Sequence, residues 1–368
     1  MITAMHNAVA GFSIGFMSLN DYHSIKKAAG ATAAVAALAA SLVACSSDDA
    51  KDAAADATSA AASAADKATD AASSAASEAK DAITGAGDGL KVFATTGYIG
   101  DAVHNIAPAA DVQVLVGPGG DPHTYQPSSK DLQDMNNADV VLWSGVHLES
   151  EMEKQLEGLG DKQEAVGEAI PKDKLLDWPE PGDNGEKLYD PHIWNDTDNW
   201  ELVVTAIADR LAKAQPEDAD AFKENAEKYN SEISDAKKYV QDKINTIPES
   251  ERDLITGHDA FNYFGREFGL KVTATDFITT ESQKSAAEIN DIAQQIVDDK
   301  IKMIFPDNVA NPQGSKSLQE IAQQKGWDVK ISDKELYADT LGESAPTNTY
   351  IGVLKHNADV IADGLGAN

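Results

Sequence analysis

Cysteine and positive charge are both scarce in this chain of 368 residues. The chain contains one cysteine, so no disulfide can form within it. Lysine and arginine together number 30, against 61 aspartates and glutamates, which gives a formal net charge of -31. Nucleic-acid binding relies on basic surface that releases counterions from phosphates, and this composition argues against it. The acidic balance is typical instead of a solvated surface that keeps a secreted protein soluble.

Long hydrophobic runs are also lacking, and the one near the N-terminus is short. Residues 28–43 form this run, which falls below the ~20 residues that a membrane-spanning helix needs. Two lysines precede it and Leu42-Val43-Ala44-Cys45 ends it, which is the order of a secretory signal peptide. The ending resembles the lipobox of bacterial lipoproteins, in which Cys45 is lipidated and becomes the first mature residue. The alternatives are a noncleaved anchor or a buried cysteine.

The first 89 residues are expected to lie outside the folded part of the protein. Residues 1–45 are the predicted signal peptide, with translation starting at Met1 or at Met17. Residues 46–89 contain no aromatic residue and are almost wholly small or charged. Such a segment cannot bury enough apolar surface to offset its ordering entropy. We predict a disordered or partly helical tether, which holds the folded part at the membrane through the lipid on Cys45.

From Leu90 onward, short β-rich runs alternate with helical stretches, which predicts parallel α/β architecture. We expect two lobes, at residues 90–215 and 248–368. Ser285 and Glu288 form a capping-box pattern that opens one of the helices. The expected strands are 91–95, 112–116, 139–143, 254–257 and 301–305, and the expected helices are 99–106, one from 128 or 129, 285–299, 315–325 and 347–365.

One long helix is predicted between the lobes, at residues 216–247. Apolar residues recur there at intervals of three or four and form a single stripe. Pro216 lies in the expected first turn, and Pro248 ends the pattern. About 28 helical residues at 1.5 Å each make a helix ~42 Å long, which is enough to span both lobes. A coiled-coil dimer is the alternative, but the stripe is short and rich in alanine, so we expect a monomer.

Three histidines follow predicted strands or helices and lie in loops. The tripeptide Asp-Pro-His occurs twice, ending in His123 and His192, and His258 follows the expected strand 254–257. Each proline stiffens the backbone that presents the histidine. Imidazole is a common ligand of zinc and related metals, and open α/β sheets bind ligands in the loops at the carboxyl ends of their strands. The pattern suggests one metal site built from distant loops.

The sequence around these histidines resembles one family. It is the family of metal-specific solute-binding proteins of bacterial ABC transporters, which serve zinc and manganese uptake. Similar motifs occur in that family in the same order as three segments of this chain, Gly119–Pro127, Asp190–Trp194 and Gly257–Phe264. The resemblance runs from about Val92 to the C-terminus. It implies two (β/α) lobes with parallel sheets, linked by the long helix, with the metal in the cleft between the lobes.

The resemblance also implies the ligands and the role of the protein. In the family, three residues at the positions of His123, His192 and His258 hold the metal together with a carboxylate near the C-terminus. The matching word here is Leu336–Gly342, which makes Asp339 the expected fourth ligand. The implied protein is extracytoplasmic, is not an enzyme, and delivers its metal to a membrane permease with an ATPase subunit. His147, beside Glu149, is a weaker candidate for an extra ligand.

A set of three histidines and one aspartate suits tetrahedral Zn²⁺, so zinc is the expected metal. Manganese is the alternative, and iron uptake by the same family is a further one. A zinc hydrolase is a competing function, but catalytic zinc keeps an open position for water and four protein ligands leave none. A surface adhesin is a third, supported only by the expected location.

Overall fold

The computed structural model describes residues 80, 82–179, 185, 187–277 and 284–366. The chain divides into two units, residues 1–79 and 80–368, and the description concerns the second. The predicted signal peptide, the lipidation site Cys45 and the tether up to residue 79 lie outside the described residues and stay predictions. Within the described residues, no helix combines the length and the apolar character needed to cross a membrane.

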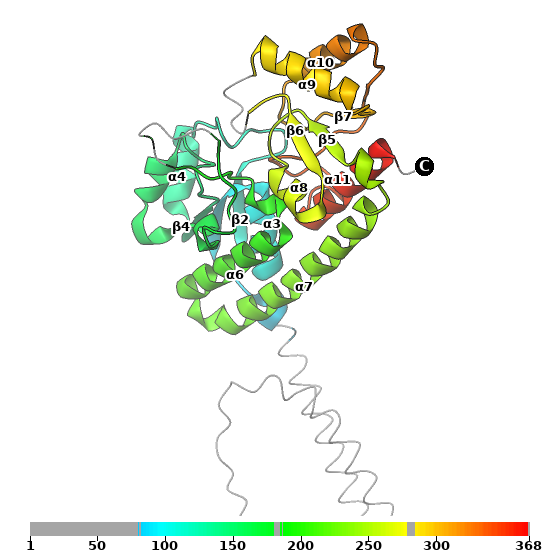
Figure 1. The fold of residues 1–368 in the computed structure, drawn as a ribbon. Coiled ribbons are helices and arrows are strands. Elements are labelled where there is room, and N and C mark those ends of the chain that lie inside the picture. Colours follow the sequence, from blue (N-terminus) through cyan, green and yellow to red (C-terminus); the bar gives the residue numbers. More distant parts are fainter. Residues whose placement is uncertain (1–79, 81, 180–184, 186, 278–283, 367–368) are drawn as a thin grey trace, which may run out of the picture. The chain divides into compact units, whose positions relative to one another are not determined.

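Two parallel sheets of four strands each form the centres of two α/β lobes (Figure 1), as the sequence predicts. The N-terminal sheet has the order β2-β1-β3-β4 and the C-terminal sheet the order β6-β5-β7-β8, so the two lobes share one topology. The strands are β1 Lys91–Thr96, β2 Asp111–Val116, β3 Val140–Trp143, β4 Gln163–Ala165, β5 Asp253–Thr256, β6 Lys271–Ala274, β7 Met303–Phe305 and β8 Lys330–Ile331.

Helices pack against the sheets, which is why the central strands are apolar. All four residues of β3 are buried, as expected of a parallel strand between two helical layers. The helices are α3 Gly97–Ile106, α4 Ser129–Asn137, α5 Glu153–Glu157, α6 Thr197–Ala214, α7 Ala219–Ile244, α8 Asn262–Phe268, α9 Ala286–Asp298, α10 Pro312–Gln324 and α11 Tyr350–Leu365.

Side-chain caps set several helix starts. Ser285 and Glu288 form the predicted capping box at α9, and Ser128 with Asp131 forms another at α4. Helix α10 begins three residues earlier than the predicted 315, because the Asn311 side chain accepts from the Gln313 backbone N–H and a proline occupies the first helical position. Helix α6 had no counterpart among the predicted helices.

The long helix α7 links the lobes and packs against α3, α6 and α11 (Figure 1). It spans Ala219–Ile244, so it is shorter than the predicted 216–247, and Pro216 begins a separate 3₁₀ turn that precedes it. The predicted apolar stripe is the buried face of the helix. Its buried residues are Phe222, Asn225, Ala226, Tyr229, Ile233, Ala236, Val240 and Ile244.

Truncating this stripe should destabilise the folded part. Ile233 in α7 is fully buried, so Ile233→Ala leaves a cavity where the helix packs on the lobes and should cost about 2–5 kcal/mol of unfolding free energy. Asp235, exposed on the same helix, is the matched control, and Asp235→Ala should stay within about 0.5 kcal/mol. Urea denaturation measures both variants. Equal stabilities for the two would show that the stripe does not hold the lobes.

Candidate metal site

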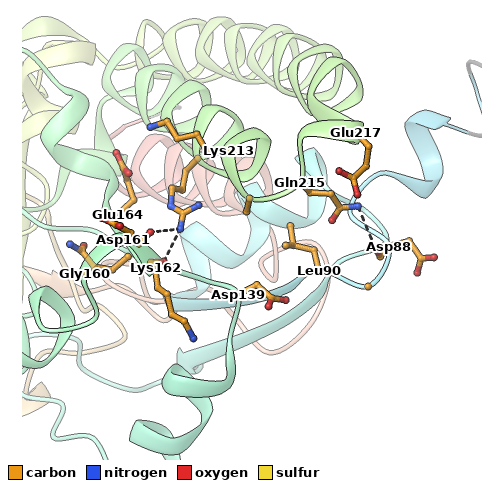
Figure 2. Close-up of a pocket in the computed structure, with 14 residues that line it drawn as sticks. Asp88, Leu90, Asp139, Gly160, Asp161, Lys162, Glu164, Lys213, Gln215 and Glu217 are labelled. Atoms are coloured by element: carbon orange, nitrogen blue, oxygen red, sulfur yellow. Dashed lines mark hydrogen bonds between the residues drawn. The ribbon is translucent and has the colours of Figure 1, made fainter.

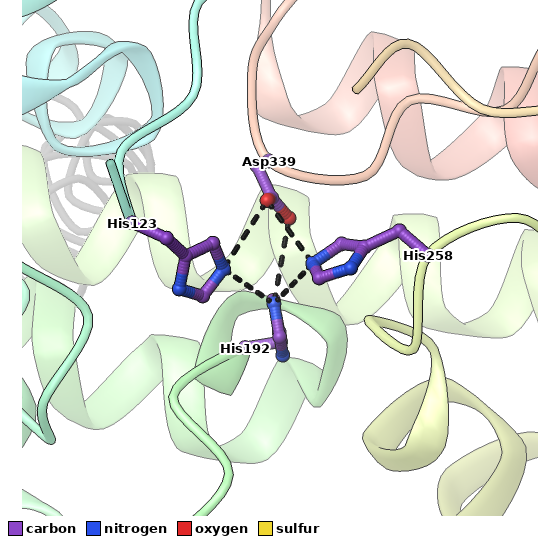
Figure 3. Close-up of side chains that lie close together, drawn as sticks. All are labelled: His123, His192, His258 and Asp339. Carbon is purple, nitrogen blue, oxygen red and sulfur yellow. Dashed lines mark hydrogen bonds and ion pairs between the residues drawn. The ribbon is translucent and has the colours of Figure 1, made fainter. Parts of the chain in front are cut away.

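Four side chains, from His123, His192, His258 and Asp339, point toward one another in the interior of the protein (Figure 3). The Nε2 atom of His192 lies 3.2 Å from Nε2 of His123 and 3.0 Å from Nε2 of His258. Oδ2 of Asp339 lies 3.4 Å from Nε2 of His123 and 3.2 Å from Nε2 of His258, and Oδ1 lies 3.5 Å from Nε2 of His192. The structure thus brings together all four residues that the sequence singled out.

Each side chain comes from a loop that follows a strand or precedes a helix. His123 lies between β2 and α4, and His192 precedes the short 3₁₀ turn that leads into α6. His258 follows β5, and Asp339 lies between β8 and α11. Because the strands of each sheet are parallel, their carboxyl ends lie on one edge, and the loops of the two lobes meet there.

The repeated Asp-Pro-His tripeptide folds in the same way at both sites. The aspartate accepts a hydrogen bond from the histidine backbone N–H two residues later, at 2.9 Å for Asp121 and 3.0 Å for Asp190. This is an Asx turn, which aspartate favours. The repeat therefore presents His123 and His192 from the same local backbone.

Asp190 also orients the imidazole of His192, a role that the sequence analysis did not predict. The Nδ1–H of His192 donates to Oδ1 of Asp190 at 2.7 Å, so the lone pair of Nε2 faces the centre of the cluster. The other oxygen, Oδ2, accepts from the side-chain amide of Asn262 at 3.1 Å. The aspartate in the tripeptide was a visible signal, because a carboxylate behind a histidine ligand is a common feature of metal sites.

Backbone groups orient His258. Its Nδ1–H donates to the carbonyl oxygen of Phe277 at 3.0 Å, and its backbone N–H donates to Oδ2 of Asp307 at 2.7 Å. Gly257 lets the loop approach, since a Cβ there would lie 2.5 Å from Cβ of Ala310 and 2.7 Å from Oδ2 of Asp307. No local sequence pattern indicates the role of Asp307, which is 49 residues away from His258.

The cluster is buried and contains one carboxylate. All four side chains are at most 2% exposed, and neither oxygen of Asp339 has a hydrogen-bond partner. Buried carboxylates without such partners are rare because burying a charge is costly. In a tetrahedral site with ligand bonds of about 2.0–2.1 Å, the donor atoms lie roughly 3.3 Å apart. The separations of 3.0–3.5 Å match this arrangement.

Burial and the neighbouring charges shift the pKa values of the cluster in opposite directions. Burial raises the pKa of Asp339, but the nearby imidazoles of His258 and His192 hold it well below its usual range overall. Burial lowers the pKa of His258, yet the charge of Asp339 raises it to about 9 overall. The pKa of His123 is lowered, chiefly by burial. Without a metal, His258 therefore carries a proton at neutral pH opposite an ionised Asp339.

The remaining histidines of the described residues lie outside this cluster. His147, considered above as an extra ligand, is half-exposed, and its Nδ1 lies 3.7 Å from Oε2 of Glu153. Glu149 turns into the protein and accepts from the hydroxyl of Thr95 at 2.6 Å and from the backbone N–H of Ser144. His104 is exposed on α3.

A second acidic group, Asp196, Asp198 and Glu267, is already compensated. Lys237 lies 2.6 Å from Oδ1 of Asp198 and 2.8 Å from Oε1 of Glu267, and Arg266 lies 2.6 Å from Oδ2 of Asp196. Each carboxylate of this group thus already has a cationic partner.

A polar pocket on the N-terminal lobe lies at the other edge of its sheet (Figure 2). It is lined by residues that precede or begin β1, β3 and β4, whereas His123 follows the carboxyl end of β2. Arg210 also lines the pocket, and its Nη2 donates to the carbonyl oxygens of Asp161 and Lys162 at 2.8 and 3.1 Å. Both signs of charge line it, and the arginine ties a loop to α6.

The sequence of this chain is similar to those of known metal-binding proteins. The family described as "Zinc-uptake complex component A periplasmic" matches residues 92–364. The manganese-binding lipoprotein MntA of Bacillus subtilis is 38% identical over 280 residues, which are 75% of this chain and 90% of that protein. The zinc-binding protein TroA of Treponema pallidum is 34% identical over 292 residues, covering 78% and 91%.

Solved structures show the same fold. The structure of the periplasmic zinc-binding protein TroA from Treponema pallidum superposes with a TM-score of 0.71 at 33% sequence identity. The alignment covers 75% of this chain and 99% of that one. The two-lobe arrangement of this chain is therefore an established fold.

Metal binding should displace the proton on His258. The pKa of His258 is about 9 in the folded protein, against an ordinary value of 6.5. At pH 7.5, Zn²⁺ binding should therefore release about one proton from His258. Well above pH 9 the imidazole is already neutral, so no proton should be released. Calorimetric titration in buffers of different ionisation enthalpy measures this. Asp339→Asn removes the largest charge that raises the pKa of His258 and leaves burial opposed only by Asp307 and Asp259, so the proton release at pH 7.5 should fall. Proton release that is equal in the two proteins would contradict the pairing.

The same pairing affects the stability of the metal-free protein. A histidine whose pKa is raised by folding stabilises the fold below pH 6.5, and this contribution is lost as pH rises through about 9. Urea denaturation of the metal-free protein at pH 6 and pH 10 tests the sign, and Asp339→Asn should lose this part of the pH dependence.

Proposed function

Because the chain belongs to the family of metal-specific solute-binding proteins of bacterial ABC transporters, we propose that it captures Zn²⁺ outside the cytoplasm and delivers it to a membrane permease. Members of this family bind their solute and are not enzymes. The observation that carries the proposal is the buried group of His123, His192, His258 and Asp339, whose donor atoms all face one point.

The donor set supports zinc. Three neutral imidazoles and one carboxylate are common zinc ligands, and their separations of 3.0–3.5 Å are close to the edges of a tetrahedron around this ion. Hydrogen bonds to Asp190 and Phe277 keep the Nε2 lone pairs of His192 and His258 turned inward. The four side chains leave no open position for a reactive water, in keeping with capture and not hydrolysis.

Manganese is the second candidate, and one feature of the site favours it. Both oxygens of Asp339 face the imidazoles, Oδ2 toward His123 and His258 and Oδ1 toward His192. The carboxylate could therefore supply two donor atoms, and Mn²⁺ prefers more oxygen ligands and a higher coordination number than Zn²⁺. The relative MntA is named for manganese, and YfeA of Yersinia pestis, 29% identical, is named for iron.

The location and partners follow from the family. Several relatives are named lipoproteins, and Cys45 ends the predicted signal peptide of this chain. We propose that a lipid on Cys45 holds the protein at the outer face of the cytoplasmic membrane, within reach of the permease and its ATPase. The low-complexity segment that follows Cys45 is proposed to act as the tether.

Removing a ligand should abolish tight binding. His123→Ala, His258→Ala and Asp339→Ala each remove one of four donors and should weaken Zn²⁺ affinity by at least about 100-fold, because the remaining charge and imidazoles are buried without a partner. Elemental analysis and competition against chelators, with Zn²⁺ and Mn²⁺ at equal free-metal activity, measure stoichiometry and preference. His104→Ala changes an exposed histidine and is the matched control, with wild-type affinity expected.

Either metal result is informative. One zinc per chain with weak manganese binding supports the zinc proposal. Stoichiometric manganese that resists exchange by zinc moves the assignment to manganese. Absence of any stoichiometric metal, or wild-type affinity in His258→Ala, contradicts the site.

Lipidation is tested independently of the metal. Cys45→Ala removes the acceptor thiol, so the expressed protein should appear in the soluble extracytoplasmic fraction and fail to incorporate labelled fatty acid. Cys45 is the chain's single cysteine, so no other thiol can substitute. Fatty-acid labelling that persists in Cys45→Ala would refute the lipobox.

A further inference from the structure

One backbone carbonyl next to the proposed ligand Asp339 accepts two hydrogen bonds from the opposite lobe. The hydroxyl of Tyr98, in α3, donates to the carbonyl oxygen of Ala338 at 3.0 Å. The indole Nε1–H of Trp194, two residues after His192, donates to the same oxygen at 2.9 Å. A carbonyl oxygen has two lone pairs, so these two donors use its full capacity. The loop that carries Asp339 is thereby attached to the N-terminal lobe.

The two donors are held rigidly. The rings of Tyr98 and Trp194 stack with centroids 5.1 Å apart and an interplanar angle of 19°. Tyr350 of α11 packs edge-on against Tyr98 at 6.2 Å, and its hydroxyl donates to the carbonyl oxygen of Trp194 at 2.8 Å. All three side chains are at most 2% exposed. Burial, followed by the charge of Asp339, raises the pKa of Tyr98 well above its usual range, so its hydroxyl keeps the proton that it donates.

The same loop is also held by its own lobe. Oδ1 of Asn308 accepts from the backbone N–H of Ala338 at 2.8 Å, and its amide donates to the carbonyl oxygen of Thr340 at 3.0 Å. The backbone around Asp339 is therefore fixed from two sides, while the carboxylate itself has no hydrogen-bond partner. Its position depends on this backbone and on the three imidazoles that face it.

Trp194 further couples this loop to a second ligand. Its ring lies edge-on to the imidazole of His192, with centroids 5.4 Å apart, and its backbone belongs to the 3₁₀ turn that follows His192. A displacement of Trp194 would thus move the acceptor beside Asp339 and the packing of His192 together.

We propose that Tyr98 and Trp194 are positioning residues of the metal site, which hold Asp339 in place across the two lobes through their shared hydrogen bonds to the Ala338 carbonyl oxygen. This inference rests on the proposed binding of metal by the four-residue cluster. It predicts that the contacts limit the release of bound metal, because Asp339 can withdraw from the metal only when both hydrogen bonds are broken.

The test compares Tyr98→Phe and Trp194→Phe with the wild type. One neutral buried hydrogen bond corresponds to a change of roughly 3- to 10-fold, so each variant should release Zn²⁺ about that much faster into excess chelator, with little change in the rate of association. Zn²⁺ is a suitable probe whichever metal is the cargo, since it outcompetes Mn²⁺ at most such sites. The absorption spectrum of the Co²⁺-loaded protein, which reports ligand geometry, should shift in both variants.

The matched control is Tyr229→Phe. It also removes a buried tyrosine hydroxyl, but that hydroxyl donates to Oδ2 of Asp101 at 2.6 Å and not to Ala338 or Trp194. A purely structural role would lower the melting temperatures of Tyr98→Phe and Tyr229→Phe alike and leave the Co²⁺ spectrum unchanged. The proposal expects wild-type release and spectrum for Tyr229→Phe.

The outcomes separate the two proposals. If the wild type binds Zn²⁺ and both variants match it in release rate and Co²⁺ spectrum, the positioning role is refuted and the metal site stands. If the wild type binds no stoichiometric metal, the proposed function fails and this inference fails with it.

Discussion

A fully buried carboxylate without a hydrogen bond of its own is the constraint on which the site depends. Moving an ionised group out of water costs several kcal/mol unless an opposite charge or strong donors compensate it. Asp339 is held in such a place by its backbone, and the groups facing it are three imidazoles. The cluster can be neutralised by a proton on His258 or by a cation between all four residues. Metal and proton thus compete for the same negative charge.

The fold supplies this cluster by topology. Two parallel sheets with the same strand order present their carboxyl-end loops to each other, and the four residues of the cluster come from four separate loops. Local hydrogen bonds then orient the imidazole rings of His192 and His258. Asp190 and the Phe277 carbonyl accept the outer N–H groups of His192 and His258, and Gly257 leaves room for Asp307 beneath the backbone. The long helix α7 keeps the lobes at the spacing that these contacts require.

Features of the fold that depend on neighbouring residues could be predicted from the sequence. The capping box of Ser285 and Glu288, the buried stripe of α7 and the alternation of strands and helices are short-range patterns, and the structure confirms them. Helix α6 was also readable, because its buried residues include Trp200, Val203 and Val204 at helical spacing, and the prediction overlooked it. Asp339 had no local signal and came only from the resemblance to a family.

Contacts between distant residues could not be predicted in this way. The Tyr98 hydroxyl and the Ala338 carbonyl are 240 positions apart, and the Trp194 indole is 144 positions from the same acceptor. No periodicity or motif relates a tyrosine in a helix to a backbone carbonyl in a late loop. Such pairs join residues of different lobes, so only the tertiary structure shows them.

The hydrogen bonds between the lobes affect how a metal receptor of this kind can release its metal. If the four residues bind metal as proposed, a buried site with four converging donors holds it tightly, and this affinity opposes its delivery to the permease. Withdrawal of Asp339 requires movement of a backbone that both lobes hold, through Asn308 on one side and Tyr98 with Trp194 on the other. Release therefore calls for a change in the relation between the lobes and not a side-chain rotation within one of them. A permease that grips both lobes at once can supply that change, because its binding energy acts on the very interface that holds the site together.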